Sequence, residues 1–453
     1  MSDAIMRNPW LWLDSHDLET ELQQLHDEGK DIPTSLRRRF RRMIRMDADD
    51  LATPGRQDKA RDLLHEGELL PLRADFKFVE PSDLKGIRTL RPRGPRSFKN
   101  VPPLGELQDR LSGAWLGRCI GCFLGKAAEG VKADRFWPFL KATKQWPVRD
   151  YIRFGRRGKV AEEFPDLVAR DGCDKLNYMP VDDDTNYTLT GHLIVRKHGA
   201  DFTPRDVGQF WLANIPLGST CTAERVAYRN LANTLLPPRS AIEGNPYREW
   251  IGAQIRADAF GYVNMGNPQR AAEWAFRDAS ISHVKNGIYG EMLMAALIAA
   301  ACCQDEPPAL LAVGLSEIPE SSRLHADIME VLAWYDEGLT HDQAVERIHE
   351  RWDDHNPHHW CHTISNAMIC AAALLWGEGE FGPSVGMAVQ AAFDTDCNGA
   401  TVGSIVGMMR GASGIPARWT DRLNNTLRTS LRGYDEVRIT DLAAETFQLY
   451  RNL

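Results

Sequence analysis

Hydrophobic positions along this chain recur mostly at the spacing of α-helices. Near the N-terminus, Leu18, Leu22 and Leu25 repeat every three or four residues before Gly29. Apolar or alanine-rich patterns with a helical period return in five longer segments: residues 107–124, 269–279, 288–303, 326–335 and 364–376. Residues three and four apart share one face of an α-helix, and alternating strand patterns are scarce. The pattern predicts an all-α protein.

A proline-rich stretch interrupts these patterns about one quarter of the way along the chain. Residues 91–95 combine arginine, proline and glycine, and Pro102 and Pro103 follow. Such residues break helices and mark junctions. We therefore predict an N-terminal helical extension over residues 1–103 and one large helical domain over residues 104–453. The length of 453 residues would also allow two or three domains.

Two segments carry glycine at every fourth position. The glycines are Gly113, Gly117, Gly121 and Gly125 in the first segment and Gly399, Gly403, Gly407 and Gly411 in the second. A four-residue step returns to nearly the same face of a helix, and an interior helical glycine costs about 1 kcal/mol relative to alanine. These ridges indicate two helices that cross in close contact. Tight packing without any chemistry would explain the glycines equally well.

Aspartates gather at two places that read as helix starts. Asp182, Asp183 and Asp184 precede an apolar helical stripe, and Asp394 and Asp396 head the second glycine segment. A single aspartate there would serve as a helix cap, and a solvated cap remains an alternative for the first run. Adjacent carboxylates repel one another unless a cation screens them, and hard divalent ions prefer oxygen ligands. We expect the two clusters to meet and to hold Mg²⁺ or Mn²⁺.

Three motifs, in this order, resemble the ADP-ribosylglycohydrolase family, whose members include dinitrogenase reductase-activating glycohydrolases. They are residues 121–129, a glycine-rich helix end that closes at Glu129; residues 182–185; and residues 394–398 in an Ala/Gly-rich helix. Residues 280–283 are similar to a helix-start motif found mid-chain in the family. The resemblance covers about residues 107–418.

The resemblance implies an all-α fold with a binuclear Mg²⁺ or Mn²⁺ centre that hydrolyses the glycosidic bond between ADP-ribose and an acceptor nitrogen or oxygen. The implied metal ligands are Asp182, Asp183, Asp184, Asp394 and Asp396, and the implied catalytic residues are Glu129, Asp183 and Asp396. Glu129 matches a loop glutamate that would orient or deprotonate the attacking water, or hold the ribose. Carboxylates beside the sugar would favour an oxocarbenium-like transition state.

Three residues depart from the family pattern. Asp182 stands where the family usually has a metal-binding threonine, Cys397 replaces the threonine that closes the late motif, and Cys122 replaces an aspartate. A thiol is a poor ligand for Mg²⁺. These changes affect the expected substrate more than the expected fold. A small-molecule N-ribosyl hydrolase acting on nucleoside-like substrates is therefore an alternative, and a non-catalytic relative is another.

Several histidines are candidates for binding a substrate or a metal ion. His283, His359 and His362, together with Asn398, are candidate substrate-binding residues. His355, His358, His359 and His362 lie near Cys361, but their spacing matches no common structural zinc site. Cys119 and Cys122 form a lone C-x-x-C pair within an apolar helix, where we expect neither redox nor zinc chemistry.

Composition and charge limit the classes of binding partner that we expect. The formal charge of −8 gives no general attraction to nucleic acid or anionic membranes, and the arginines between Arg37 and Arg45 read as a solvated helix face. The first twenty residues lack the apolar core of a signal peptide, and the most apolar run, residues 292–303, is too short to cross a bilayer. We expect a cytoplasmic protein with reduced cysteines and a small-molecule or ADP-ribosylated substrate. The sequence leaves the oligomeric state open.

Overall fold

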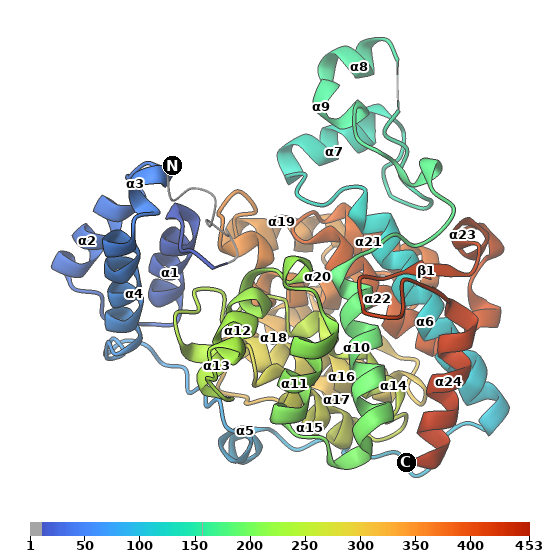
Figure 1. Ribbon diagram of the computed structural model, residues 1–453. Helices are drawn as coiled ribbons and strands as arrows, with labels where there is room; N and C mark the ends of the chain where they lie inside the picture. Colours follow the sequence, from blue (N-terminus) through green and yellow to red (C-terminus); the bar gives the residue numbers. More distant parts are fainter. Residues whose placement is uncertain (1–10, 156) are drawn as a thin grey trace.

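The computed structural model describes residues 11–155 and 157–453, and the regular secondary structure in this part of the chain is almost entirely helical (Figure 1). Two short strands, β1 (Thr426–Arg428) and β2 (Glu436–Arg438), pair antiparallel with Leu427 opposite Val437. The prediction of an all-α protein is confirmed. None of the helices in the described ranges combines the length and apolar character needed to cross a membrane.

The N-terminal helices form a group of their own at one side of the molecule (Figure 1). They are α1 (Ser15–Asp27), α2 (Thr34–Ile44), α3 (Ala48–Leu51) and α4 (Pro54–Glu68), and α5 (Leu84–Leu90) follows below them. Leu18 and Leu25 of α1 pack with Phe40 of α2 and Leu63 of α4 in an apolar cluster separate from the main core. The helix predicted from the spacing of Leu18, Leu22 and Leu25 is thus confirmed. Residues 91–103 contain no helix, and α6 begins at Leu104.

The main body contains the remaining helices. They are α6 (Leu104–Lys126), α7 (Ala133–Ala142), α8 (Lys159–Glu163), α9 (Pro165–Val168), α10 (Asp183–His198), α11 (Pro204–Asn214), α12 (Thr222–Ala232), α13 (Arg239–Ile242), α14 (Asp258–Tyr262), α15 (Pro268–Ala279), α16 (Asn286–Ala301), α17 (Pro307–Leu315), α18 (Arg323–Asp336), α19 (His341–Arg351), α20 (Thr363–Trp376), α21 (Phe381–Gln390), α22 (Thr395–Arg410), α23 (Ala417–Thr420) and α24 (Ile439–Asn452). Short 3₁₀ turns are η2 (Cys173–Lys175), η3 (Gly199–Asp201), η4 (Leu217–Ser219), η5 (Gln254–Arg256), η6 (His359–Cys361), η7 (Ala412–Gly414) and η8 (Asp421–Leu423). All five longer segments predicted as helices are helical, and α7, α8 and α9 project from the body (Figure 1).

Helices α6 and α22 form the closest helix pair of the core. A Cβ atom added to Gly117 would overlap the carbonyl oxygen of Gly403, and one added to Gly403 would overlap the carbonyl oxygen of Gly117. The same exchange joins Gly121 with Gly399 and Gly113 with Gly407, so the helices run antiparallel with backbone against backbone. The predicted contact between the two glycine ridges is confirmed. Nearby, α16 is buried along its whole length, as the apolar run from Met292 to Ala301 favours.

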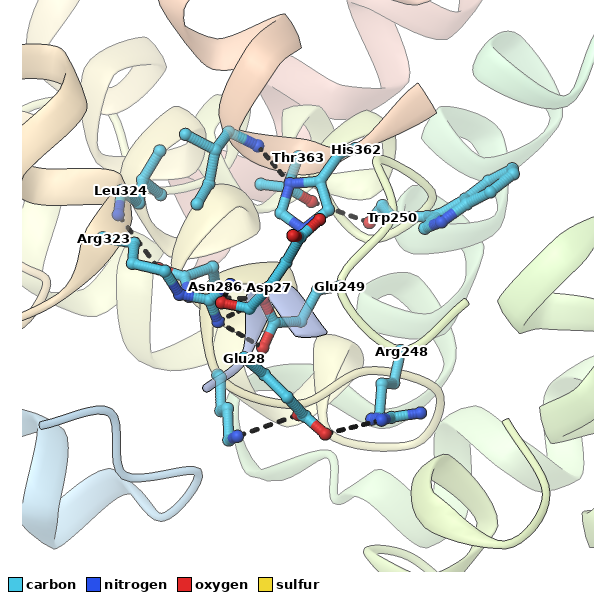
Figure 2. A network of polar contacts seen from close by, with 12 residues as sticks. Asp27, Glu28, Arg248, Glu249, Trp250, Asn286, Arg323, Leu324, His362 and Thr363 are labelled. Atoms are coloured by element: carbon cyan, nitrogen blue, oxygen red, sulfur yellow. Dashed lines mark hydrogen bonds and ion pairs between the residues drawn. The ribbon is translucent and has the colours of Figure 1, made fainter. Parts of the chain in front are cut away.

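Buried ion pairs attach the N-terminal helices to the main body (Figure 2). Glu28, which follows α1, accepts hydrogen bonds from Arg248 at 2.7 Å and from Lys285 at 2.9 Å. Arg323 of α18 contacts Glu249 at 2.6 Å and Glu80 at 2.8 Å. Because each of these carboxylates is shielded from water and paired with a cation, the junction satisfies the charges that it buries.

Candidate metal centre

The antiparallel helix pair brings two of the acidic segments together. Gly125, near the end of α6, lies against Thr395 at the start of α22, and the Thr395 hydroxyl donates to the Gly125 carbonyl at 2.8 Å. Glu129 follows the end of α6, and Asp394 and Asp396 lie at the start of α22. Aspartates at a helix start accept backbone N–H groups and complement the helix dipole. The late acidic motif therefore adjoins the loop glutamate.

Helix α10 supplies the other acidic segment. Asp182 caps the helix by accepting the Asp184 backbone N–H at 2.9 Å, and its second oxygen accepts a 2.6 Å hydrogen bond from Lys126 Nζ. Asp184 is fully buried, and one of its oxygens accepts from Arg118 at 2.7 Å. The predicted helix start is confirmed. Both aspartates lie against the last turns of α6.

The predicted ligands Asp182, Asp184 and Asp396 converge at one place. Two groups of three ligand atoms, each within 4.8 Å of one another, occur in the described chain: one from Cys122, Asp182 and Asp184, and one from Asp184, Asp396 and Cys397. Asp184 is common to both. The arrangement is compact enough for a bound cation to touch several ligands at once.

Unpaired oxygens show that the cluster fits a cation. Within the described part of the chain, Asp184 Oδ2 and Asp396 Oδ1 are buried and have no hydrogen-bond partner. A buried carboxylate oxygen without a donor costs free energy unless a proton or a metal ion satisfies it. The donor set is dominated by carboxylate oxygens, which divalent ions such as Mg²⁺ and Mn²⁺ accept. The residues therefore fit the ion that the sequence implied.

Asp183, Asp394 and Glu129 flank this cluster and lie outside the two three-ligand groups. Asp394 Oδ2 accepts from the Cys361 thiol at 3.2 Å, while the Asp394 backbone N–H donates to Asn366. Asp183 is half-buried, and Glu129 is exposed. Asp394 is buried, whereas Asp183 and Glu129 can be reached by solvent and hence by a substrate.

The pKa values of the acidic residues reflect their crowding. Burial, followed by the charges of Asp182 and Glu129, raises the pKa of Asp183 well above its usual range. Burial, with Glu129 and Asp394, does the same for the pKa of Asp396. Loss of hydration and the charge of Asp394 raise the pKa of Glu129. Each shift has the direction expected of carboxylates that lack sufficient positive charge nearby.

Two cations partly neutralise the cluster, and sequence reasoning missed both. Lys126 contacts Asp182, and Arg118 contacts Asp184 and, at 3.3 Å, Asp258. Burial lowers the pKa of Lys126, but the charge and hydrogen bond of Asp182, together with the charges of Cys122 and Asp396, outweigh burial and raise it. One indication of these contacts was present in the sequence. Arg118 is a charged residue inside an apolar, glycine-spaced segment, and a buried arginine requires an acidic partner.

The structure places the candidate histidines away from the acidic cluster, in packed positions. His362 is buried, stacks on Trp352, and accepts the Ile364 backbone N–H at 3.1 Å. Burial and the positive charge of Arg323 lower its pKa to about 3. His359 lies 3.2 Å from Asp27 of α1. Neither three-ligand group of the described chain contains a histidine.

His283 and Asn398 are likewise held by core contacts. His283 is buried beside the Ser282 hydroxyl at 2.8 Å, and burial together with Arg256 lowers its pKa well below the usual value. The Asn398 side chain donates to Asn366 Oδ1 at 2.8 Å and is fully buried. Asn398 thereby braces Asn366, which in turn accepts the Asp394 backbone N–H. The substrate-binding roles of these residues stay predictions.

Comparison with known proteins assigns the chain to a family. Residues 103–452 match the sequence model of the ADP-ribosylglycohydrolase family, and the chain therefore belongs to that family of glycohydrolases. A solved structure described as an ADP-ribosylglycohydrolase-related protein complex is 21% identical, with a TM-score of 0.47, and the match covers 77% of this chain and 99% of that one. No curated protein matches the sequence. The family resemblance predicted from the three motifs is confirmed.

Proposed function

We propose that this protein is a metal-dependent glycohydrolase that cleaves the bond between the anomeric carbon of ADP-ribose, or of a related ribosyl group, and an acceptor nitrogen or oxygen. The observation that carries the proposal is the convergence of Asp182, Asp184 and Asp396, with two buried unpaired oxygens, beside the exposed Glu129. Family membership supports the class of reaction. The acidic cluster supports the need for a metal.

The residues have distinct roles in this proposal. Asp182, Asp183, Asp184, Asp394 and Asp396 hold Mg²⁺ or Mn²⁺, in a centre of two ions. When bound, the ions supply positive charge that fixes the ribose hydroxyls and polarises the reacting centre. The carboxylates at the rim stabilise positive charge that develops on the sugar ring as the bond breaks.

Glu129 is the proposed general base. It is exposed, follows α6 directly, and lies within the electrostatic reach of Asp394 and Asp182. A carboxyl with a raised pKa exchanges protons more effectively near neutral pH than an ordinary one. Glu129 accepts a proton from the attacking water, and the acceptor group leaves with a proton from solvent.

A hydrolysis panel tests the proposal. The full chain, with Mg²⁺ or Mn²⁺, is offered ADP-ribosylated arginine and serine peptides and free nucleosides. We expect Asp183→Ala and Asp396→Ala to lose turnover and to weaken metal binding in calorimetry, while Asp421→Ala, at an exposed position of η8, retains both. Turnover of nucleosides alone would favour the N-ribosyl hydrolase alternative. No turnover, with equal metal binding in all four proteins, would refute the proposal.

A further inference from the structure

Two thiols lie among the oxygens of the candidate metal centre. Cys122 belongs to one three-ligand group and Cys397 to the other. Both are buried, with Cys122 on α6 and Cys397 on α22. Because the two groups share Asp184, each half of the cluster offers one sulfur atom.

The oxygens beside these thiols point independently to a ligand. Asp184 Oδ2 and Asp396 Oδ1 are buried without a partner in the described chain, and both residues belong to the group that contains Cys397. A thiol beside a satisfied carboxylate would be ordinary core packing. A thiol beside carboxylate oxygens that still lack a partner is a candidate member of the same coordination set.

Other cysteines of the core provide a contrast. The Cys361 thiol donates to Asp394 Oδ2, and the Cys370 thiol lies 3.5 Å from Asn398 Oδ1. Cys119 lies one turn before Cys122 on α6 and is equally buried. None of these three belongs to either group of ligand atoms. Cys122 and Cys397 therefore differ from their neighbours in position and not in burial.

We propose that Cys397, with Cys122 as the second candidate, ligates the metal through sulfur, so that this centre selects a thiol-binding divalent ion such as Fe²⁺, Co²⁺ or Zn²⁺ over Mg²⁺. The inference rests on the proposed function, since it assumes that the acidic cluster binds metal. Sulfur ligands favour softer ions, while Mg²⁺ binds oxygen almost exclusively. Coordination replaces the S–H bond with a sulfur–metal bond and releases the proton to solvent.

Cobalt substitution tests this proposal without a substrate. The full chain, freed of metal by chelation, is titrated with Co²⁺ and followed by near-ultraviolet absorption, where thiolate ligation produces a charge-transfer band. The variants are Cys397→Thr and Cys122→Ala, with Cys370→Ala and Cys119→Ala as matched buried controls. Calorimetry with Co²⁺, Mn²⁺ and Mg²⁺ gives the affinity of each protein for each ion.

We expect wild type and both controls to show the band and Cys397→Thr to lose it. The preference for Co²⁺ over Mg²⁺ should fall by at least about tenfold in Cys397→Thr. Loss of the band in Cys122→Ala alone would assign the sulfur ligand to Cys122, in the group with Asp182 and Asp184. This result would still support sulfur ligation. Binding of Co²⁺ by wild type without the band would overturn sulfur ligation and leave the proposed function intact. Failure of Co²⁺, Mn²⁺ and Mg²⁺ to bind to wild type would overturn both proposals.

Discussion

The carbonyl oxygen of Gly403 lies where a side chain on Gly117 would begin. An alanine at position 117 would force α6 and α22 apart, because the obstacle is backbone and cannot rotate away. We expect Gly117→Ala to lower the free energy of unfolding by about 1–3 kcal/mol or more, although alanine gains about 1 kcal/mol in helix propensity. Urea unfolding monitored by circular dichroism measures the difference.

Gly105 is the matched control for that substitution. It lies in the first turn of the same helix, and an added Cβ atom would meet nothing within 4 Å. Gly105→Ala should leave stability unchanged or raise it by up to about 1 kcal/mol. Equal losses in the two variants would mean that the glycine ridge is not the cause.

In the proposed metal centre, Lys126 competes with the ion for Asp182. Its Nζ atom donates to Asp182 Oδ2 at 2.6 Å. In Lys126→Met the cluster gains one unit of net negative charge and a free oxygen. We expect Mn²⁺ affinity to rise by about tenfold or more, because removing a nearby unit charge changes the energy of an ion by roughly 1–4 kcal/mol. Calorimetry provides the measurement, with Lys197→Met, at an exposed position of α10, as control. Weaker binding in Lys126→Met would show that the lysine supports the metal.

Arg323 holds two buried carboxylates at the junction with the N-terminal helices (Figure 2). Its contacts are Glu249 at 2.6 Å and Glu80 at 2.8 Å. Removing one partner from a buried ion pair leaves an uncompensated charge, so Arg323→Met should cost about 3–5 kcal/mol in thermal or urea unfolding. Arg351, which contacts Asp327 at 2.9 Å with its side chain 42% exposed, is the control. Arg351→Met should cost at most about 1 kcal/mol.

Glu21 makes stability depend on pH. Burial raises its pKa to about 7 against the opposing charge of Arg248. The folded protein holds this proton more tightly than the unfolded chain, whose carboxyl has a pKa of 4.5. The contribution of the Glu21 proton to the free energy of unfolding is therefore fully present below pH 4.5 and is lost as the pH rises through about 7. The total loss is up to about 3 kcal/mol.

The amide variant isolates that contribution. Glu21→Gln is neutral throughout, so its melting temperature should fall less between about pH 5 and pH 8 than that of wild type. Glu19→Gln, at an exposed position of the same helix, should retain the wild-type slope. A slope in Glu21→Gln equal to that of wild type would assign the pH dependence to other groups.

The helices and the glycine contact were predictable because both depend on spacing along the chain. The period of Leu18, Leu22 and Leu25 and the four-residue step of the glycines are local properties, and the structure agrees with them. The convergence of Asp182, Asp184 and Asp396 was also expected, since the order of the motifs resembled a family with a known arrangement.

Contacts between side chains distant in sequence could not be predicted. Arg118 pairs with Asp184 and Asp258 because three helices meet there, and no local pattern encodes that meeting. The position of Cys122 among the candidate metal-ligating atoms depends on the rotation of α6 against α10. The hydrogen bond from Asn398 to Asn366 in the core is another contact that the motif does not encode.

The pairing of Arg248 with Glu21 and Glu28 has a practical consequence for producing this protein. The guanidinium belongs to the part of the chain that matches the family, but both carboxylates precede residue 103, where the match begins. A version truncated at that residue would retain the cation and lose its two counter-charges, with the Asn245 carbonyl left as a partner at 2.9 Å. The boundary suggested by homology is therefore a poor place to cut the gene, and a fragment intended for purification should begin before α1.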